Sequence, residues 1–343
     1  MLPQIILIKW LGSYPEFIET FYSKGLYPII SGLWRTLLGW IPFSVGDVLY
    51  ALLILLGVGY IVTNRFAIKK NFLGFLRDIA MVLSVAYFTF HLLWGFNYYR
   101  EPLSKTLEIG ANHSQEDLIN LIGQLVQKTN ETQFKITRDS SKFVEVPYTK
   151  KEIFELTIGG YESLEKKIPL FSYNPPSIKN SIFSTALTYM GYGGYLNPFT
   201  NEAQANGRLP NFRFPVICGH EIGHQLGFSA ENETNFIGYL VTVNNDNIYF
   251  KYSAYAYALS YCLNDLAKRD PDAFKSYYDK LNPGVKKNYT EIADFWRAHE
   301  NPLEPVFKSI FNTFLKANNQ KEGIKSYNAV VSLLINYYRK NPI

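Results

Sequence analysis

The residues best suited to chemistry stand together in the stretch Cys218-Gly-His-Glu-Ile-Gly-His-Gln-Leu-Gly227. On a helix, residues four apart lie on one face, so His220 and His224 can offer two imidazole nitrogens to a single metal ion. Glu221 points towards the same ion without being a ligand, which is where a general base for an activated water must stand. Only five histidines occur in the chain, so this spacing rarely arises by chance. The motif predicts a zinc site on a helix, with Glu221 as the catalytic base.

The third protein ligand is expected a few residues downstream. Gly227 suits the end of the metal-binding helix, because glycine adopts the left-handed conformation at little cost. We expect Ser229 to cap a second helix that carries Glu231 and Glu233 in its first turn, where the helix dipole favours negative charge. The two carboxylates compete for the metal, since residues two apart point to nearly opposite helix faces.

The neighbours of each carboxylate favour Glu231. The residues that share its helix face are polar or small and suit a close approach to the metal helix: Asn235, Gly238 and Thr242. The residues that share a face with Glu233 are apolar and typical of a core: Ile237 and Leu240. We therefore predict Glu231 as the third metal ligand, with Glu233 as the runner-up. Asn235 is expected to hydrogen-bond a ligating histidine from behind.

Two long apolar runs precede this region. Residues 48–62 and 79–96 carry no fixed charge and, with their flanks, reach the length needed to cross a bilayer. They predict transmembrane helices over about residues 46–63 and 77–97 of a membrane anchor that comprises residues 1–100. The loop between them, residues 63–78, carries four Lys or Arg against one Asp. Basic short loops stay in the cytoplasm, so the zinc motif is expected on the extracytoplasmic side.

The first residues of the anchor are less regular. Residues 1–12 are apolar but too short to span a bilayer alone, and we expect a truncated or partly interfacial first helix. Residues 14–43 mix charges, tryptophans and three prolines, which indicates an interfacial or re-entrant element on the membrane surface. His91 lies near the outer end of the second predicted span, and we expect a structural role for it.

After a polar linker at residues 101–113, residues 114–343 are predicted to form a mainly helical domain. Ser114 and Thr149 open capping boxes, which predict helices from residue 115 to about 129 and from about 149 to 167. Helices are expected again from residue 248 to the C-terminus.

A small sheet is expected before the metal helix. Alternating β-branched and aromatic residues predict a strand over residues 181–189, followed by a turn at residues 190–194. Three polar residues further on are interpreted as a solvated loop: Glu202, Asn206 and Arg208.

Charge and cysteine content exclude some classes. The formal net charge is +5 with no basic cluster, so nucleic-acid binding has no support. Cys218 and Cys262 are too few to define a disulfide framework, although one disulfide between them is allowed outside the cytoplasm.

The run His220-Glu-x-x-His224, followed by Glu231-x-Glu-x-Asn235, resembles the glutamate-zincins of the membrane-bound CAAX-protease type. Their third ligand is the first Glu of a Glu-x-x-Ala-Asp run, where this chain has Thr and Asn in the last two places. A closer resemblance covers nearly the whole chain and is to a bacterial family of membrane-anchored, zinc-peptidase-like proteins with a domain of unknown function. Besides the zinc motif, four pieces carry it: Pro42-Phe-Ser-Val-Gly-Asp47, Trp94-Gly-Phe-Asn-Tyr-Tyr-Arg100, Met190-Gly-Tyr-Gly-Gly194 and Asn197-Pro-Phe-Thr200.

This resemblance implies a zincin-like α+β peptidase domain with a small sheet and a helical C-terminal part, held in the bacterial inner membrane. Zincins place an edge strand beside the metal helix, where a peptide substrate can add as a further strand. Residues 195–199 either line such a cleft or form a plain hairpin. An oxyanion stabiliser is expected from the downstream part, where Tyr327 is the candidate and His299 is expected to be exposed.

We therefore expect a membrane-anchored zinc metallopeptidase that acts on a peptide or protein substrate and has the lipid bilayer as a partner. The alternative is a catalytically silent, zinc-stabilised envelope scaffold or binding protein of zincin fold. Retention of Glu221 argues against the alternative, because a structural zinc needs no base. A transporter is disfavoured, because the predicted spans hold almost no polar residues.

Overall fold

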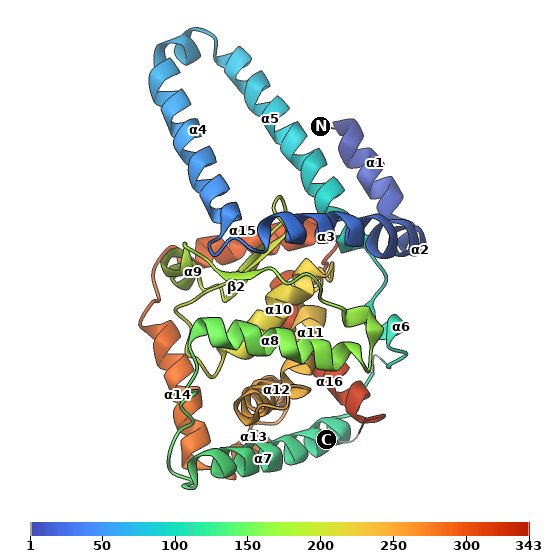
Figure 1. Ribbon diagram of the computed structural model, residues 1–343, viewed down its shortest axis with the longest axis vertical. Helices are drawn as coiled ribbons and strands as arrows, with labels where there is room; N and C mark the ends of the chain where they lie inside the picture. Colours follow the sequence, from blue (N-terminus) through green and yellow to red (C-terminus); the bar gives the residue numbers. More distant parts are fainter. Residues whose placement is uncertain (1, 111, 342) are drawn as a thin grey trace.

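The computed structural model describes the whole chain except residues 1, 111 and 342, and describes the backbone alone of Lys325, Tyr327 and Asn328. The molecule is mainly helical, as predicted, with one three-stranded sheet (Figure 1). A helical hairpin and one short helix project from one end. A layer of surface helices follows, and a helical body lies below it.

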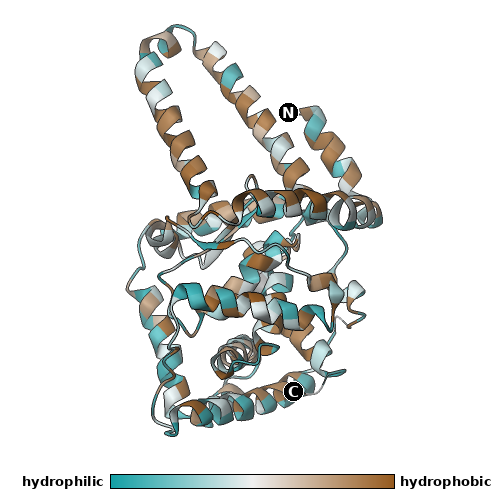
Figure 2. Ribbon diagram, viewed as in Figure 1, coloured by the Kyte–Doolittle hydropathy of each residue, from teal (hydrophilic) through white to brown (hydrophobic). Residues whose placement is uncertain are grey.

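The hairpin consists of α4, Val45–Lys70, and α5, Phe72–Leu93. Both helices are long and apolar enough to cross a membrane, and almost none of their apolar length is buried by the rest of the chain (Figure 2). The loop expected at residues 63–78 is wrong, because both helices continue through the basic residues. The turn is confined to Asn71, whose side chain accepts a hydrogen bond from the backbone N–H of Gly74. The short helix α1, Leu2–Gly12, lies beside α5 (Figure 1).

Three helical segments run across the base of the hairpin: α2, Pro15–Phe17; the π-helix η1, Ile18–Leu26; and α3, Tyr27–Leu38. On α3, the residues buried against the body recur every four positions: Tyr27, Ser31 and Arg35. The opposite face exposes apolar side chains at the same spacing: Ile29, Leu33 and Leu37. The α3 helix is therefore amphipathic with its apolar face turned away from the body.

The body is a set of packed helices, of which α10 and α11 lie at the centre with α8, α12 and α16 around them (Figure 1). Its helices are α7, Gln115–Thr137; α8, Lys150–Glu165; α10, Phe214–Gln225; α11, Glu231–Val243; α12, Ile248–Arg269; α13, Pro271–Asp279; α14, Pro283–Arg297; α15, Glu304–Ala317; and α16, Val330–Tyr338. Both predicted capping boxes are confirmed, at Ser114 and Thr149. The α7 helix continues to Thr137, beyond the expected end near residue 129, and its last turns bury polar side chains: Thr132 and Gln133.

The sheet has the order β1-β3-β2. The strand β3, Glu202–Ala205, pairs parallel with β1, Ile178–Asn180, and antiparallel with β2, Gly194–Asn197. The strand predicted over residues 181–189 is wrong, since most of that stretch forms the helix α9, Ser184–Met190. The strand β2 is an edge strand, with β3 as its one partner among the described residues.

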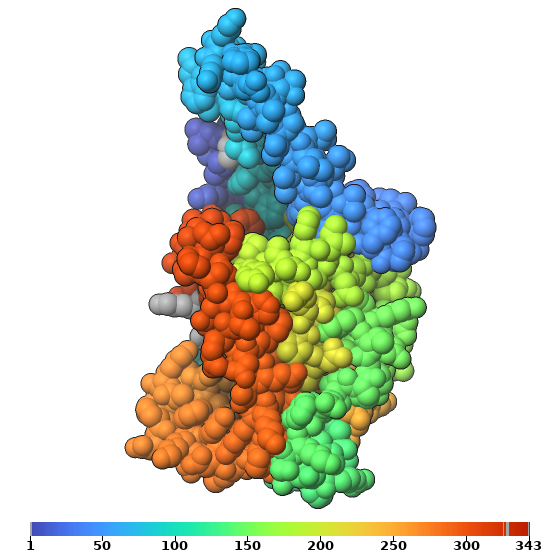
Figure 3. Space-filling view, turned by 90° about the vertical axis from the view of Figure 1, so that its left-hand side faces the viewer, coloured from blue at the N-terminus to red at the C-terminus, as the bar shows by residue number. Residues whose placement is uncertain are grey.

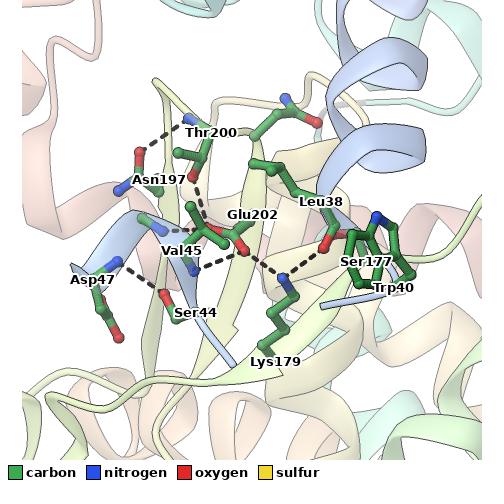
Figure 4. A network of polar contacts seen from close by, with 12 residues as sticks. Leu38, Trp40, Ser44, Val45, Asp47, Ser177, Lys179, Asn197, Thr200 and Glu202 are labelled. Carbon is green, nitrogen blue, oxygen red and sulfur yellow. Dashed lines mark hydrogen bonds and ion pairs between the residues drawn. The ribbon is translucent and has the colours of Figure 1, made fainter. Parts of the chain in front are cut away.

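Buried polar contacts join the start of α4 to the sheet (Figure 4). The Glu202 carboxylate accepts hydrogen bonds from the backbone N–H groups of Val45 and Gly46, and it pairs with Lys179 at 2.5 Å. Lys179 also donates to the Leu38 carbonyl at 2.8 Å. The expectation of a solvated loop at Glu202 and Asn206 is wrong, because both side chains are fully buried.

Asp47 makes a second connection between α4 and the region of the sheet. One of its carboxylate oxygens accepts hydrogen bonds from the Ser181 hydroxyl at 2.9 Å and the Ile182 N–H at 2.7 Å. The other accepts from the hydroxyl of Tyr195 on β2. The first turn of α4 therefore holds both the entry to α9 and the edge strand.

The segment expected as a linker, residues 101–113, contains the short helix α6, Leu103–Thr106. Leu103 is only 1% exposed and belongs to the core of the body. Leu103 and Ile109 thus fix this segment to the body.

Candidate metal centre

The two helices that carry the predicted metal site cross at a pair of glycines. A Cβ atom on Gly238 of α11 would lie 2.5 Å from the backbone oxygen of Val216 on α10. A Cβ atom on Gly219 would lie 3.0 Å from the Cα atom of Gly238. Only residues without a side chain allow this approach, which brings the first turn of α11 beside the imidazoles of α10.

Three side chains from these helices converge. The Nε2 atoms of His220 and His224 lie 3.3 and 3.5 Å from the same carboxylate oxygen of Glu231, Oε2. The three ligand atoms all lie within 4.8 Å of one another, and all three residues are buried. This cluster could hold a metal ion.

Hydrogen bonds behind each imidazole determine which nitrogen faces the cluster. The Nδ1 atom of His220 donates to the side-chain oxygen of Asn235 at 2.9 Å, and that of His224 donates to the Phe228 carbonyl at 2.8 Å. Because both acceptors take the proton on Nδ1, both Nε2 atoms present lone pairs. Asn235 is in turn held by the hydroxyl of Tyr257, which donates to the same oxygen at 2.6 Å. Asn235 therefore lies where the sequence predicted it.

The donor set fits a divalent cation. Two imidazole lone pairs and a carboxylate oxygen point at one another, and Glu231 Oε2 has no hydrogen-bond donor among the described residues. Such groups repel unless a proton or a metal ion lies between them. Burial raises the pKa of Glu231, but the two imidazoles outweigh it and lower the pKa below its ordinary range. Burial lowers the pKa of His224, but Glu231 and Glu221 outweigh it and raise the pKa to about 9. The site therefore demands positive charge, which a metal ion would supply.

Glu221 lies beside the cluster but outside the set of three. It is 3% exposed, and its Oε2 atom has no hydrogen-bond partner among the described residues. Burial, followed by the charge of Glu231, raises its pKa to about 8, although His224 lowers it. A Cβ atom on Gly194, the first residue of β2, would lie 2.6 Å from Glu221 Oε1. The carboxylate therefore lies directly against the edge strand.

Glu233, the alternative ligand, is not brought to the cluster. Its carboxylate accepts a hydrogen bond from the Leu103 N–H at 2.6 Å. Burial raises its pKa to about 7, against the lowering effects of that hydrogen bond and of Arg100. Glu231 and Glu233 are two residues apart on one helix, so their side chains point to different faces of it.

The turn after the metal helix differs from the prediction in one detail. Gly227 has a φ of +89° and ends the helix in the left-handed conformation, as expected. Ser229 does not cap α11, which has Ala230 at its N-cap and no side-chain cap. Its hydroxyl donates instead to the Asn97 carbonyl at 2.8 Å.

Residues from the N-terminal third hold the end of the metal helix. The indole N–H of Trp94 donates to the His224 carbonyl at 3.0 Å, the Tyr27 hydroxyl to the Gln225 carbonyl at 2.7 Å, and Arg100 to the Gly227 carbonyl at 2.9 Å. The last carbonyls of a helix have no partner within the helix, so these donors supply one. Sequence reasoning placed all three donors in the membrane anchor and missed this role. Only the clustering of polar and aromatic residues at residues 94–100 signalled it.

The remaining candidates lie apart from the cluster or outside the described side chains. Tyr327 falls in the 3-10 helix η4, Gly323–Ala329, and its side chain lies outside the described residues. The Nδ1 atoms of His91 and His299 hydrogen-bond to carbonyls four residues earlier in the chain. Cys218 and Cys262 are both buried and free, so the allowed disulfide is not formed.

Tyr98 is a residue near the cluster that sequence reasoning missed as a site residue. It is 8% exposed, and burial together with the Glu231 charge raises its pKa well above the ordinary value. Its phenol therefore remains protonated and can donate a hydrogen bond. One tyrosine among 26 gives no sequence signal of this position.

Comparison with known proteins gives a family for the chain. No curated protein and no solved structure matches it significantly. A family model described as "Protein of unknown function (DUF3810)" matches residues 22–335, which span α3, the hairpin, the sheet and both metal-site helices. With nearly its whole length matched, the chain belongs to the DUF3810 family.

Proposed function

We propose that this protein is a membrane-anchored zinc metallopeptidase. His220, His224 and Glu231 would hold the metal, because two imidazoles and a carboxylate are a ligand set that suits zinc and leaves a coordination position open. When bound, zinc would act as a Lewis acid that acidifies a water molecule and polarises the substrate carbonyl.

Glu221 would act as the general base. In its ionised form, which the charge of a bound metal ion would favour, its carboxylate would accept a proton through the free oxygen Oε2 as water adds to the carbonyl carbon of the peptide. Glu221 would then pass that proton to the nitrogen of the leaving amine as the C–N bond breaks. Water is thereby divided between the new carboxyl and amino ends, and no other reactant is needed.

The substrate would bind along β2. As an edge strand, β2 can accept a peptide by backbone hydrogen bonds. The contact between Gly194 and Glu221 is the observation that carries the proposal, because a peptide added to this strand would have its backbone beside the base. Tyr98, a buried phenol whose pKa is raised by burial and by the Glu231 charge, is a second candidate, besides Tyr327, for the donor to the developing oxyanion.

The hairpin of α4 and α5 would anchor the protein in the bacterial inner membrane. The basic residues lie on both helices beside its turn, which would lie in the cytoplasm and leave the metal centre outside. The exposed apolar length of both helices supports this anchoring.

The test is the metal content of the detergent-purified full chain, measured by plasma mass spectrometry. We expect about one zinc per chain in the wild type and in Glu221→Gln, and loss of zinc in Glu231→Gln. Glu233→Gln is the matched control, because it changes a buried carboxylate of the same helix turn away from the cluster and should keep the metal.

Hydrolysis of a peptide library by the same samples separates the two functions. Cleavage by the wild type and by Glu233→Gln, but not by Glu221→Gln, would support the peptidase. Zinc in all samples except Glu231→Gln, with no cleavage by any of them, would instead support the zinc-stabilised scaffold. A wild type that holds no metal when zinc is supplied would overturn both.

A further inference from the structure

The helix α15 exposes an apolar stripe that no described part of the chain covers. Four large apolar residues on one side of it are 61%, 52%, 63% and 39% exposed, in the order Leu303, Val306, Ile310 and Phe314. Their spacing of three and four residues places them on a single helix face. The neighbouring exposed face carries polar residues, among them Ser309 and Lys316. Four of the eight large apolar side chains that are exposed in the described body belong to this stripe, with Leu303 at the N-cap of the helix.

The C-terminal end of the apolar stripe of α15 lies against the base of the hairpin. The Phe314 ring lies 6.0 Å from that of Phe90 in the last turn of α5, and 6.1 Å from that of Tyr98. At the other end, Asn301 donates to the Tyr189 carbonyl in α9 at 2.6 Å. The helix therefore runs from α9 to the foot of α5, at the height where the hairpin leaves the body (Figure 1).

The outward face of α3 lies at the same height. Figure 1 shows α3 and α15 at one level, directly below the hairpin. In Figure 3, the red-orange residues of α15 and blue residues of the N-terminal third lie on opposite sides of a yellow-green surface at that level. Ile29 and Leu33 of α3 are 70% and 58% exposed on the side away from the body. Two amphipathic helices, far apart in sequence, thus present apolar faces at one level around the foot of α4 and α5.

We propose that α15 is a membrane-surface helix whose apolar stripe lies in the outer interface of the lipid bilayer. The argument is continuity, because the stripe adjoins the foot of a hairpin whose own apolar surface is exposed throughout. A helix with one apolar face and one polar face lies in the plane of that interface. This inference rests on the proposed crossing of the membrane by the hairpin. In this arrangement the body would contact the bilayer through α3 on one side of β2 and through α15 on the other.

This arrangement defines a substrate class for the proposed peptidase. The edge strand β2 and the metal centre would lie between two membrane-resting helices, beneath the foot of α4, whose Tyr50 ring lies 6.4 Å from the Tyr195 ring. A peptide added to β2 would then run close to the membrane surface. The substrate would be the membrane-proximal segment of a protein that is itself held in the bilayer.

The experiment measures the depth of spin labels on the full chain in lipid nanodiscs, by their collisions with oxygen and with a water-soluble nickel chelate. Both native cysteines are buried, so single added cysteines can be labelled selectively. Ile310→Cys samples the apolar stripe. Ser309→Cys is the matched control, since it lies one residue away and about 100° round the helix. Leu55→Cys, 70% exposed in the middle of α4, reports whether the hairpin is in lipid.

We expect the label at position 310 to collide several-fold more with oxygen relative to nickel than the label at position 309, and the label at position 55 to do so most strongly. Equal nickel access at 309 and 310, with 55 in lipid, would overturn this inference alone. Nickel access at 55 would overturn the membrane anchor as well. A label at 310 shielded from both reagents would indicate a protein on the stripe, and loss of dipolar broadening on dilution with unlabelled chain would identify it as a second copy. None of these readouts depends on catalysis.

Discussion

Each imidazole of the metal centre is held by an acceptor on its far side. Asn235 accepts from His220, and the Phe228 carbonyl accepts from His224. A hydrogen bond of this kind orients the ring and makes the opposite nitrogen a better ligand. Because Asn235 also accepts from Tyr257, its oxygen is fixed in place by a helix that carries no ligand.

The role of Asn235 can be tested by removing and then restoring its oxygen. Asn235→Ala should weaken zinc binding by about 10- to 100-fold, because His220 loses the acceptor that orients it. Asn235→Asp keeps an acceptor oxygen at the same place and should retain most of the affinity. Competition with a fluorescent zinc chelator would measure both. Equal affinities for the wild type and Asn235→Ala would show that the asparagine has no part in ligand orientation.

At this scale the sequence predicted most of the cluster and missed what surrounds it. Helical spacing predicted that His220, His224 and Glu231 lie on facing sides of two helices. The apolar residues that share a helix face with Glu233 predicted that its carboxylate lies away from the cluster. Tyr98 and Trp94 could not be identified, because their contacts with the site join residues more than 100 positions apart. Nothing local in the sequence encodes such contacts.

Among the elements, the crossing of α10 and α11 depends on the absence of side chains at two positions. Gly238→Ala should lower the free energy of unfolding by about 1–3 kcal/mol or more, because its Cβ would meet the Val216 carbonyl at 2.5 Å. Gly159→Ala in α8 is the matched control. No atom lies within 4 Å of its added Cβ, so it should be neutral or stabilising by up to about 1 kcal/mol. Thermal unfolding in detergent measures both variants, and a Gly238→Ala protein as stable as Gly159→Ala would contradict the close crossing.

The ion pair between Lys179 and Glu202 joins the sheet to α4 and provides a second test. Lys179→Met should cost about 3–5 kcal/mol, because it leaves a buried carboxylate without its cation. Adding Glu202→Gln should restore part of the lost free energy of unfolding. The double variant should therefore lose less stability than the two single variants lose in total. The exposed Lys151, 4.0 Å from Glu155, gives the comparison, and Lys151→Met should change stability by less than about 0.5 kcal/mol. Strict additivity of the buried pair would show that the two side chains do not interact.

The wrong predictions of secondary structure also arise from contacts between residues that are far apart in the sequence. Residues 181–189 have the alternating pattern of a strand. Asp47, however, accepts hydrogen bonds from the Ser181 hydroxyl and the Ile182 N–H, and the chain continues into the helix α9. Glu202 and Asn206 looked solvated because the sequence does not show that α4 and α9 cover them. Capping boxes, by contrast, are complete within four residues, and both were predicted correctly.

The whole molecule has its polar body at one end and its bare apolar hairpin at the other. The orientation proposed for it can be measured with Lys70→Cys, at the turn of the hairpin, and Lys275→Cys, in α13 of the body. Both positions are exposed and the native thiols are buried, so the background is low. In spheroplasts, a membrane-impermeant maleimide should label position 275 directly and position 70 only after permeabilisation. The reverse pattern would place the metal centre in the cytoplasm, and labelling of both would show that the hairpin does not cross.

The donors that end the metal helix come from the part of the chain that is synthesised first. Tyr27, Trp94 and Arg100 have left the ribosome before α10 is made, and their partners are the carbonyls of His224, Gln225 and Gly227. A gene rearrangement that moved residues 101–343 behind a different leader would leave all three carbonyls without these donors. Such a chimaera would keep the His-Glu-x-x-His motif but lose the hydrogen bonds that hold the end of its helix. The candidate site and the first hundred residues are therefore inherited as one structural unit, and a chain shortened to residues 101–343 would keep the motif without the donors that end its helix.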